Sequence, residues 1–260
     1  MAQDLPKDWK TYDDFAYGIA TNRLPLSEAL NGKSVNVTLE DGRKLSLTFD
    51  GNQVNWTDEK GSGADACEVI EVAPNTYFVE LALASRPKES ETVIANLKSG
   101  RVLSIYSIIR EAGAFPGEPQ VAQIFRPGTV DGVAATGIVP HETRDLIGLR
   151  AHMTYSPNHT YEHTYLSSKR YAWQCLVGVQ RGHGDVDLAT TYKFDENQYV
   201  FTFREFKIPV ASTFFYNFDD MRSTGKFLGI AGDGSIQNNP AGAFIRKVSQ
   251  TFYELGQEPV

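Results

Sequence analysis

The segment Lys33–Phe49 reads KSVNVTLEDGRKLSLTF and indicates how this chain folds. Apolar and polar residues alternate on both sides of Asp41-Gly42, which is the pattern of strands that each bury one face. Asp-Gly is itself a strong signal for a two-residue hairpin turn. We therefore predict two antiparallel strands, Lys33–Leu39 and Lys44–Phe49.

Similar short runs, separated by Gly, Asn, Asp and Pro, fill most of the chain and predict an all-β protein. The strands expected next are Gln53–Thr57, Ala66–Val72, Thr76–Leu83, Thr92–Asn96 and Arg101–Ile109. Helices are expected to be few and short, at Lys7–Ala16, Ser27–Leu30 and His141–Leu146.

The composition is that of a folded globular chain, with 260 residues, 41% apolar and 22% charged. The formal charge of -7, without clustered Lys or Arg, argues against nucleic acid or an anionic membrane as a partner. Two cysteines are too few for a disulfide framework or a thiolate metal site. No signal peptide or membrane span is apparent, so we expect a cytoplasmic protein, and the sequence leaves a homo-oligomer open.

The order of strand signals is repeated along the chain, which predicts an internal duplication. We expect an N-terminal arm over residues 1–30, a first β module over 31–110, a linker over 111–140 and a second module over 141–260. Corresponding landmarks are Gly32 and Gly148, Trp56 and Trp173, Asp65 and Asp185, Tyr77 and Tyr199, and Gly100 and Gly225. Two antiparallel barrels, or two halves packed together, would hide the strand edges of such modules.

The second module holds the polar aromatic residues. All five histidines lie within residues 141–183, and the segment Tyr155–Tyr165 reads YSPNHTYEHTY. Ser-Pro-Asn predicts a turn, followed by a strand with Tyr161 and His163 on one face. His159 and His163 would be about 13 Å apart on a strand, so we expect no metal site and buried, hydrogen-bonded histidines instead.

A second candidate segment is Tyr199–Lys207, in which Arg204 and Glu205 interrupt an aromatic run. Alternation places these two charges on opposite faces, so one of them should point into a barrel. A carboxyl group in an aromatic cavity would have a raised pKa and could act as general acid or base, whereas arginine could hold a substrate anion. A structural Arg-carboxylate pair between strands is the open alternative.

With Tyr155–Leu166, Arg170–Leu176 and Met221–Lys226, the sequence resembles the MoaF family, commonly labelled molybdenum cofactor biosynthesis protein F. The resemblance covers roughly residues 30–110 and 140–255. It implies tandem calycin-like, lipocalin-related barrels and, through the family's association with a monoamine-utilisation regulon, an aromatic amine or a product of one. It supplies no catalytic residues.

Our first hypothesis is a cofactor-independent lyase, isomerase or hydratase that acts by acid/base chemistry on a small aromatic or amine-derived compound. Calycin-like phenolic acid decarboxylases, similar only in expected fold, work with Tyr, Arg and Glu. The alternatives are a non-catalytic carrier or sensor of an aromatic ligand, and an accessory protein of molybdenum cofactor biosynthesis, as the family label says. The catalytic candidates are His159, Tyr161, His163 and Glu205, and the substrate-binding candidates are Tyr171, Tyr192, Arg204 and Tyr216.

Overall fold

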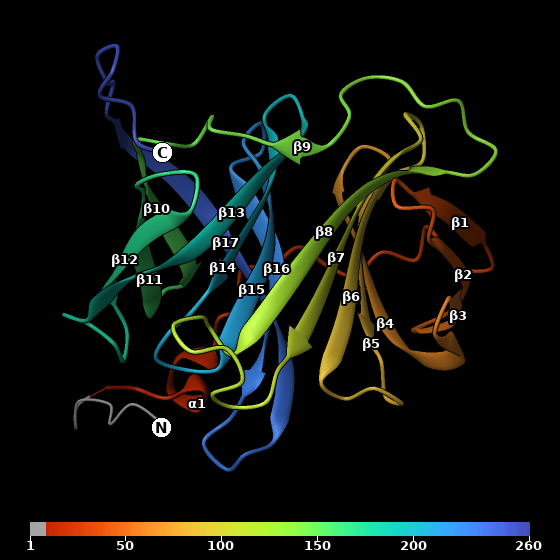
Figure 1. The fold of residues 1–260 in the computed structure, drawn as a ribbon, viewed down its shortest axis with the longest axis horizontal. Coiled ribbons are helices and arrows are strands. Elements are labelled where there is room, and N and C mark those ends of the chain that lie inside the picture. Colours follow the sequence, from red (N-terminus) through yellow and green to blue (C-terminus); the bar gives the residue numbers. More distant parts are fainter. Residues whose placement is uncertain (1–8) are drawn as a thin grey trace.

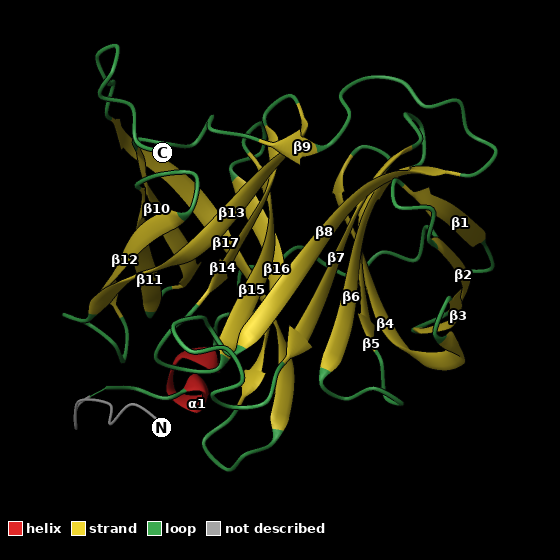
Figure 2. Cartoon of the chain, in the orientation of Figure 1, coloured by secondary structure: helices red, strands yellow, loops and turns green. Residues whose placement is uncertain are grey.

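The computed structural model describes residues 9–260 and contains two closed antiparallel barrels lying side by side (Figure 1). Almost every element is a strand, as predicted, and the helix is a single short one, α1 (Tyr12–Ala16) (Figure 2). No helix among these residues is long and apolar enough to cross a membrane. The tandem β modules predicted from the sequence are thus two separate closed barrels.

The first barrel is an eight-stranded meander in which each strand pairs with the next and the last returns to the first. Its strands are β1 (Ser34–Leu39), β2 (Lys44–Asp50), β3 (Gln53–Asp58), β4 (Gly61–Ala73), β5 (Thr76–Ala82), β6 (Glu89–Asn96), β7 (Arg101–Ile109) and β8 (Val121–Val130). Closure leaves no unpaired edge inside this sheet.

Strand β8 lies inside the range 111–140 that we expected to be a linker, and this expectation was wrong for residues 121–130. Pro127 and Gly128 interrupt its apolar alternation, which hid the strand from pattern analysis. The strand forms because it bonds β7 on one side and β1 on the other, and so closes the barrel.

The second barrel repeats the meander, and β17 pairs with β10 to close it. Its strands are β10 (Leu149–Ser156), β11 (His159–Tyr165), β12 (Arg170–Val177), β13 (Gly184–Asp195), β14 (Gln198–Arg204), β15 (Val210–Asn217), β16 (Arg222–Ile230) and β17 (Ile236–Gln250). The short β9 (His141–Glu142) pairs with β13 in an antiparallel direction at Tyr192 and Lys193.

Two of the three predicted helices are absent. Residues Ser27–Leu30 are irregular and end in a turn, and His141–Leu146 contains β9 followed by a turn. Both segments are too short for helical hydrogen bonds to offset the cost of nucleation. The third prediction is confirmed in part by α1, while Lys7 and Asp8 lie outside the described residues.

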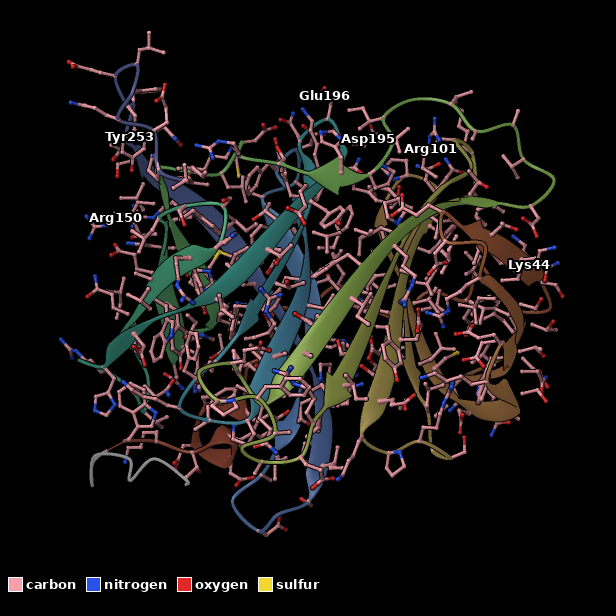
Figure 3. All side chains as sticks on the ribbon, in the orientation of Figure 1. Lys44, Arg101, Arg150, Asp195, Glu196 and Tyr253 are labelled. Atoms are coloured by element: carbon pink, nitrogen blue, oxygen red, sulfur yellow. The ribbon has the colours of Figure 1, made fainter. Side chains whose placement is uncertain are left out.

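The two barrels differ in what fills them. Side chains occupy the interior of both (Figure 3), but the first core is largely aliphatic whereas the second is dominated by Tyr and Phe. A third apolar cluster joins the barrels, between outward-facing residues of β4–β7 and of β13–β15. It includes Ile70, Phe78 and Leu103 from the first barrel, and Phe194 and Phe215 from the second.

A buried indole–carboxylate pair occurs at the same place in each barrel. Trp56 Nε1 donates to Asp65 at 2.6 Å, and Trp173 Nε1 donates to Asp187 at 3.0 Å. The equivalent of Asp65 is therefore Asp187, and our alignment with Asp185 was wrong by two residues. Asp185 instead lies directly opposite Trp173 in the β12–β13 ladder.

The β6–β7 and β15–β16 turns also correspond. Asn96 pairs with Arg101 as Asn217 pairs with Arg222, so Gly100 is equivalent to Met221 and not to Gly225, as we had aligned it. Both residues have positive φ, 67° for Gly100 and 51° for Met221. The left-handed conformation costs a residue with a Cβ about 1–2 kcal/mol.

We expect Met221→Gly to raise the free energy of unfolding by about 1 kcal/mol, because glycine adopts this φ without strain. Urea unfolding of the purified protein would measure the change. The control is Met221→Ala, which keeps the Cβ and should bring no gain. An equal gain in both variants would contradict a backbone origin.

Candidate functional site

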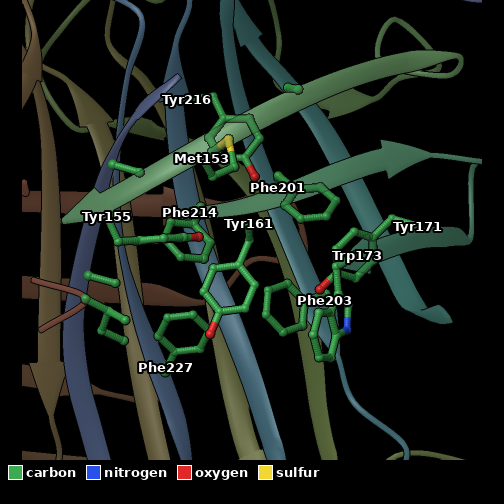
Figure 4. Close-up of a cluster of buried hydrophobic side chains, with 14 of the residues drawn as sticks. Met153, Tyr155, Tyr161, Tyr171, Trp173, Phe201, Phe203, Phe214, Tyr216 and Phe227 are labelled. Carbon is green, nitrogen blue, oxygen red and sulfur yellow. The ribbon is translucent and has the colours of Figure 1, made fainter. Parts of the chain in front are cut away.

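A cavity in the second barrel has about 40 Å³ that the centre of a water molecule can reach, or about 410 Å³ of space between atoms counted to its opening. Aromatic rings form most of its wall, and Figure 4 shows several of them, including Tyr155, Tyr161 and Trp173. The lining residues are Phe15, Ile19, Tyr155, Tyr161, His163, Tyr171, Trp173, Gln180, Phe203, Glu205 and Phe227. A mostly aromatic lining with a few polar groups is typical of a small-molecule site.

Glu205 is the one acidic side chain in the wall of this cavity. It continues the inward face of β14, two residues beyond Phe203, and it is only 8% exposed. Burial, followed by the charges of Asp187 and Asp185, raises the pKa of its carboxyl group well above the usual range. Burial therefore favours the protonated form of this carboxyl group, which faces the cavity.

The indole–carboxylate pair positions this acid. The Asp187 carboxylate accepts the Trp173 Nε1 hydrogen bond and also one from the Phe206 backbone N at 3.3 Å. Because Phe206 directly follows Glu205, the second bond fixes the backbone at the acid. Burial also raises the pKa of Asp187 itself, to about 6.

His163 lines the cavity from β11, which is separated from β14 by two strands, β12 and β13. Burial lowers its pKa to about 3, so the imidazole is neutral in the folded protein. Its Nδ1 has no hydrogen-bond partner among residues 9–260. The rings of Tyr165 and Tyr171 contact it edge-on, with centroids 6.3 and 5.3 Å away.

Three phenols complete the polar lining. The Tyr161 hydroxyl donates a 2.7 Å hydrogen bond to Gln180 Oε1, which reaches the cavity from the β12–β13 loop. Burial raises the pKa values of Tyr155, Tyr161 and Tyr171 above that of free tyrosine. The phenols are hydrogen-bond donors and stay protonated.

The equivalent positions of the first barrel are apolar. The strand registers align the two barrels. The pair Thr38–Lys44 at the β1–β2 turn corresponds to Thr154–Thr160 at the β10–β11 turn. Likewise, the pair Leu47–Trp56 corresponds to His163–Trp173. By this register, the polar cavity residues Tyr155, Tyr161 and His163 replace Leu39, Leu45 and Leu47.

Glu205 has an apolar counterpart too. The Asp65 carboxylate accepts a hydrogen bond from the Ala84 backbone N, as Asp187 accepts one from Phe206, so Leu83 corresponds to Glu205. Leu83 is 3% exposed in the first core. The barrel fold therefore accepts leucine at this position, and the carboxyl group is not a requirement of the architecture.

The first barrel has a smaller pocket at the corresponding place, with about 310 Å³ of space between atoms counted to its opening. Its wall includes Leu39, Leu45, Trp56 and Leu83, together with charged side chains. The Arg86 guanidinium lies 4.9 Å from the centroid of the Trp56 ring and contacts Asp58 at 2.7 Å, and Arg43 pairs with Glu59 at 2.6 Å. The cavity of the second barrel is the larger of the two, and it is lined by histidine and tyrosine in place of leucine.

The N-terminal arm covers one end of this cavity. Phe15 and Ile19 form part of the wall, and the Phe15 ring packs 5.4 Å from that of Phe227. The Tyr12 hydroxyl donates to the Phe227 carbonyl at 2.7 Å, and Asp13 accepts from the Gly232 backbone N at 2.7 Å. The arm thereby covers part of the cavity.

The structure brings together four of the predicted site residues. Tyr161, His163, Tyr171 and Glu205 all line the cavity. Of the two charges on the β14 segment, it is Glu205 that points inward. The site also contains residues that we did not select, including Tyr155, Trp173 and Gln180. Tyr155 was detectable, because it begins the segment we singled out, whereas Gln180 lies in a loop without periodicity.

The other four predicted site residues lie elsewhere. His159 faces an outer groove, and Tyr216 is buried in the second core away from the cavity lining. Tyr192 faces outward and stacks on Phe125 of the first barrel. Arg204 also faces outward, where it donates to Thr190 Oγ1 at 2.9 Å, and so forms no pair with Glu205. Strand alternation explains the last two, since both are one residue out of phase with the inward face.

No group of three or more His, Cys, Asp or Glu side chains within residues 9–260 could hold a metal ion. His159 and His163 do not converge, because His159 lies at the groove and His163 at the cavity. The polar groups that line the cavity are carboxyl, imidazole, phenol, amide and indole groups.

Residues 7–111 match the model of the MoaF N-terminal domain, and residues 140–251 match that of the MoaF C-terminal domain. The chain belongs to the MoaF family. It is also similar to Protein MoaF of Klebsiella aerogenes, with 28% identity over 258 residues and 91% of each chain covered. The C-terminal match spans the second barrel, whereas the N-terminal match includes the arm and ends before β8 of the first barrel. The family resemblance seen in the sequence is confirmed.

Likeness to solved structures is slight. A putative beta-lactamase from Burkholderia vietnamiensis matches 40% of this chain and 95% of its own, with 14% identity and a TM-score of 0.34. The beta chain of DNA polymerase III from Streptococcus pneumoniae matches 90% of this chain and 82% of its own, with 8% identity and a TM-score of 0.14. Neither similarity carries a functional argument.

We expect the stability of the wild-type protein to depend on pH through His163. An unfolded histidine titrates near pH 6.5, whereas folded His163 has a pKa of about 3, so stability is lost as the pH falls below about 6.5. Relative to His163→Leu, the wild type should lose about 2 kcal/mol of unfolding free energy between pH 7 and pH 5. Denaturant unfolding at both pH values measures this. His163→Phe should behave like the leucine variant, and parallel pH profiles in all three proteins would contradict the assignment.

Proposed function

We propose that this family member is a cofactor-independent enzyme, a lyase, isomerase or hydratase, that acts on a small aromatic or amine-derived compound in the second barrel. The observation that carries the proposal is the conversion of four leucine positions of the first barrel into Tyr155, Tyr161, His163 and Glu205 around one cavity. Buried polar groups cost stability, and the first barrel does without them at these positions. Function is the remaining reason for their presence in the second.

The cavity holds one group that can donate a proton and one that can accept a proton. Burial favours the protonated form of Glu205 and the neutral imidazole of His163, and with a pKa of about 3 in the empty site His163 is a weak base. In the proposed reaction, Glu205 donates a proton to the bound compound and His163 removes one from it. Exchange with solvent between turnovers restores both groups.

The lining also suits an aromatic ring bearing an amino group. Tyr155, Trp173 and Phe203 offer ring faces and edges to an aromatic ligand. An ammonium group would be attracted to these rings and to Glu205 once its carboxyl group ionises. This supports the amine-derived class that the family resemblance implied.

A carrier or sensor of the same ligand is the second candidate. The arm residues Phe15 and Ile19 close the cavity, and an enclosed apolar barrel is a common binding site for a transported ligand. This candidate differs from the enzyme in one respect, since it binds without conversion.

The test incubates the protein with phenolic acids, aromatic amines, aromatic aldehydes and a pterin, followed by native mass spectrometry and product analysis. A new product supports the enzyme. A one-to-one adduct without product supports the carrier instead, and a retained pterin would favour the molybdenum cofactor label.

For the compound that is converted, we expect Glu205→Leu and Glu205→Gln to lower kcat by a factor of about 100 or more, as for loss of a general acid. Folding should persist, because leucine stands at the equivalent Leu83. The pKa of the Glu205 carboxyl group is higher in the folded than in the unfolded protein. The free energy of unfolding of the wild type therefore falls as the pH rises above the pKa of the unfolded carboxyl group. Glu205→Leu lacks this loss, so its stability relative to the wild type should increase over the same pH range.

The matched control is Glu91→Gln, which changes a buried carboxyl group in the first barrel. It should leave kcat unchanged. Turnover retained in both Glu205 variants, or lost equally in Glu91→Gln, would contradict the proposed site.

A further inference from the structure

An open groove adjoins the cavity, and we infer that it is an outer subsite for the distal part of the same ligand, an inference that rests on the proposed function. It encloses about 1190 Å³, counted out to solvent. Three segments line it: arm residues 17–21, the β10–β11 turn at 156–159 and loop residues 177–179. The ligand class that fits is an aromatic ring with an apolar chain that carries a hydrogen-bond acceptor.

The groove and the cavity are separated by a single layer of residues. On each of the three segments, one residue lines the groove and its neighbour in the sequence lines the cavity. Gly18, Ser156 and Val179 line the groove, and their neighbours Ile19, Tyr155 and Gln180 line the cavity. In this proposal, a ligand whose ring occupies the cavity extends into the groove by displacing Ile19 and Gln180, which lie in the layer between the two spaces. Both side chains belong to the arm or to a loop rather than to the barrel strands.

The apolar character of the groove supports a chain of methylene groups. Tyr17, Val177 and Val179 are 84%, 43% and 51% exposed, and all three line the groove. Apolar side chains gathered on one exposed concave surface are typical of a binding site. A hydrocarbon chain laid over them would be removed from water together with them.

His159 supplies the polar contact. Its side chain is buried, with 5% exposure, and its Nε2 has no hydrogen-bond partner among residues 9–260. Nδ1 lies 3.0 Å from Ser156 Oγ, and that oxygen accepts the Asn158 backbone N–H at 3.2 Å. We assign the serine hydroxyl as the donor to Nδ1, which places the imidazole proton on Nε2 and makes Nε2 a donor.

Two glycines hold this imidazole between the arm and the loop. A Cβ built on Gly18 would lie 3.4 Å from His159 Cε1, and one on Gly178 would lie 3.3 Å from Cδ2. Nε2 is bonded to both of these ring carbons and is itself buried, so it lies beneath the contact between the two segments. A carbonyl oxygen of a ligand in the groove would reach it when the Gly18 and Gly178 segments move apart.

The experiment compares two probes by calorimetric titration, para-ethylphenol as the short one and a phenol bearing a hexanoic N-methylamide chain as the long one. For the wild type, we expect the long probe to bind about tenfold more tightly or better, since several methylene groups are buried. Val179→Trp fills the groove and should remove this advantage while leaving the affinity for the short probe unchanged. Val248→Trp, at an exposed strand position outside the groove, is the matched control and should change neither affinity.

His159→Phe keeps the ring and removes the donor. It should weaken binding of the long probe about fivefold, with no effect on the short probe and none on the amide-free hexylphenol. A purely structural role of His159 would change all three affinities together.

The outcomes separate the two proposals. Equal affinities of the two probes for the wild type, or an unchanged preference in Val179→Trp, would overturn the outer subsite alone. Failure of both probes to bind, or binding of para-ethylphenol that Glu205→Leu and Tyr161→Leu leave unaffected, would overturn the cavity site and the subsite that depends on it.

Discussion

The hydrogen bond from a buried indole to a buried carboxylate is the constraint on which both barrels depend. It joins Trp56 to Asp65 and Trp173 to Asp187, and each carboxylate also binds the backbone N–H that follows the next strand. Satisfied in this way, a buried charge can persist in a core. In the second barrel, the same carboxylate lies close enough to Glu205 to raise its pKa, so a structural device also prepares the acid of the candidate site.

Duplication explains how a polar cavity could arise in a stable protein. The first barrel keeps a largely aliphatic core, has arginine ion pairs at its smaller pocket and packs against the second through Phe78, Leu103 and Phe215. The second barrel has polar groups where the first has four leucines, and the arm, which is anchored through Tyr12 and Asp13, covers part of its cavity. The candidate site thus lies in the copy whose core departs from the aliphatic pattern.

Much of this architecture was predictable because alternation and turn chemistry are local properties. The Asp41-Gly42 hairpin, the inward face of Tyr161 and His163, and the opposition of Arg204 and Glu205 followed from period-two spacing alone. The prediction failed where long-range pairing overrides the local pattern. Strand β8 forms around Pro127 only because the barrel needs it for closure, and the equivalence of Met221 with Gly100 follows from ladder register rather than from residue type.

By itself, the sequence determined the fold class, the duplication, the MoaF resemblance and the segments in which polar aromatic residues gather, since each of these depends on the order and spacing of neighbouring residues. Only the tertiary structure decided which of two opposed charges faces the cavity, which four of eight candidate residues converge, and that Tyr192 and Arg204 face the other barrel. The physical reason is that barrel closure and the docking of an arm distant in sequence fix which strand face is inside. Those contacts join residues that no local pattern connects.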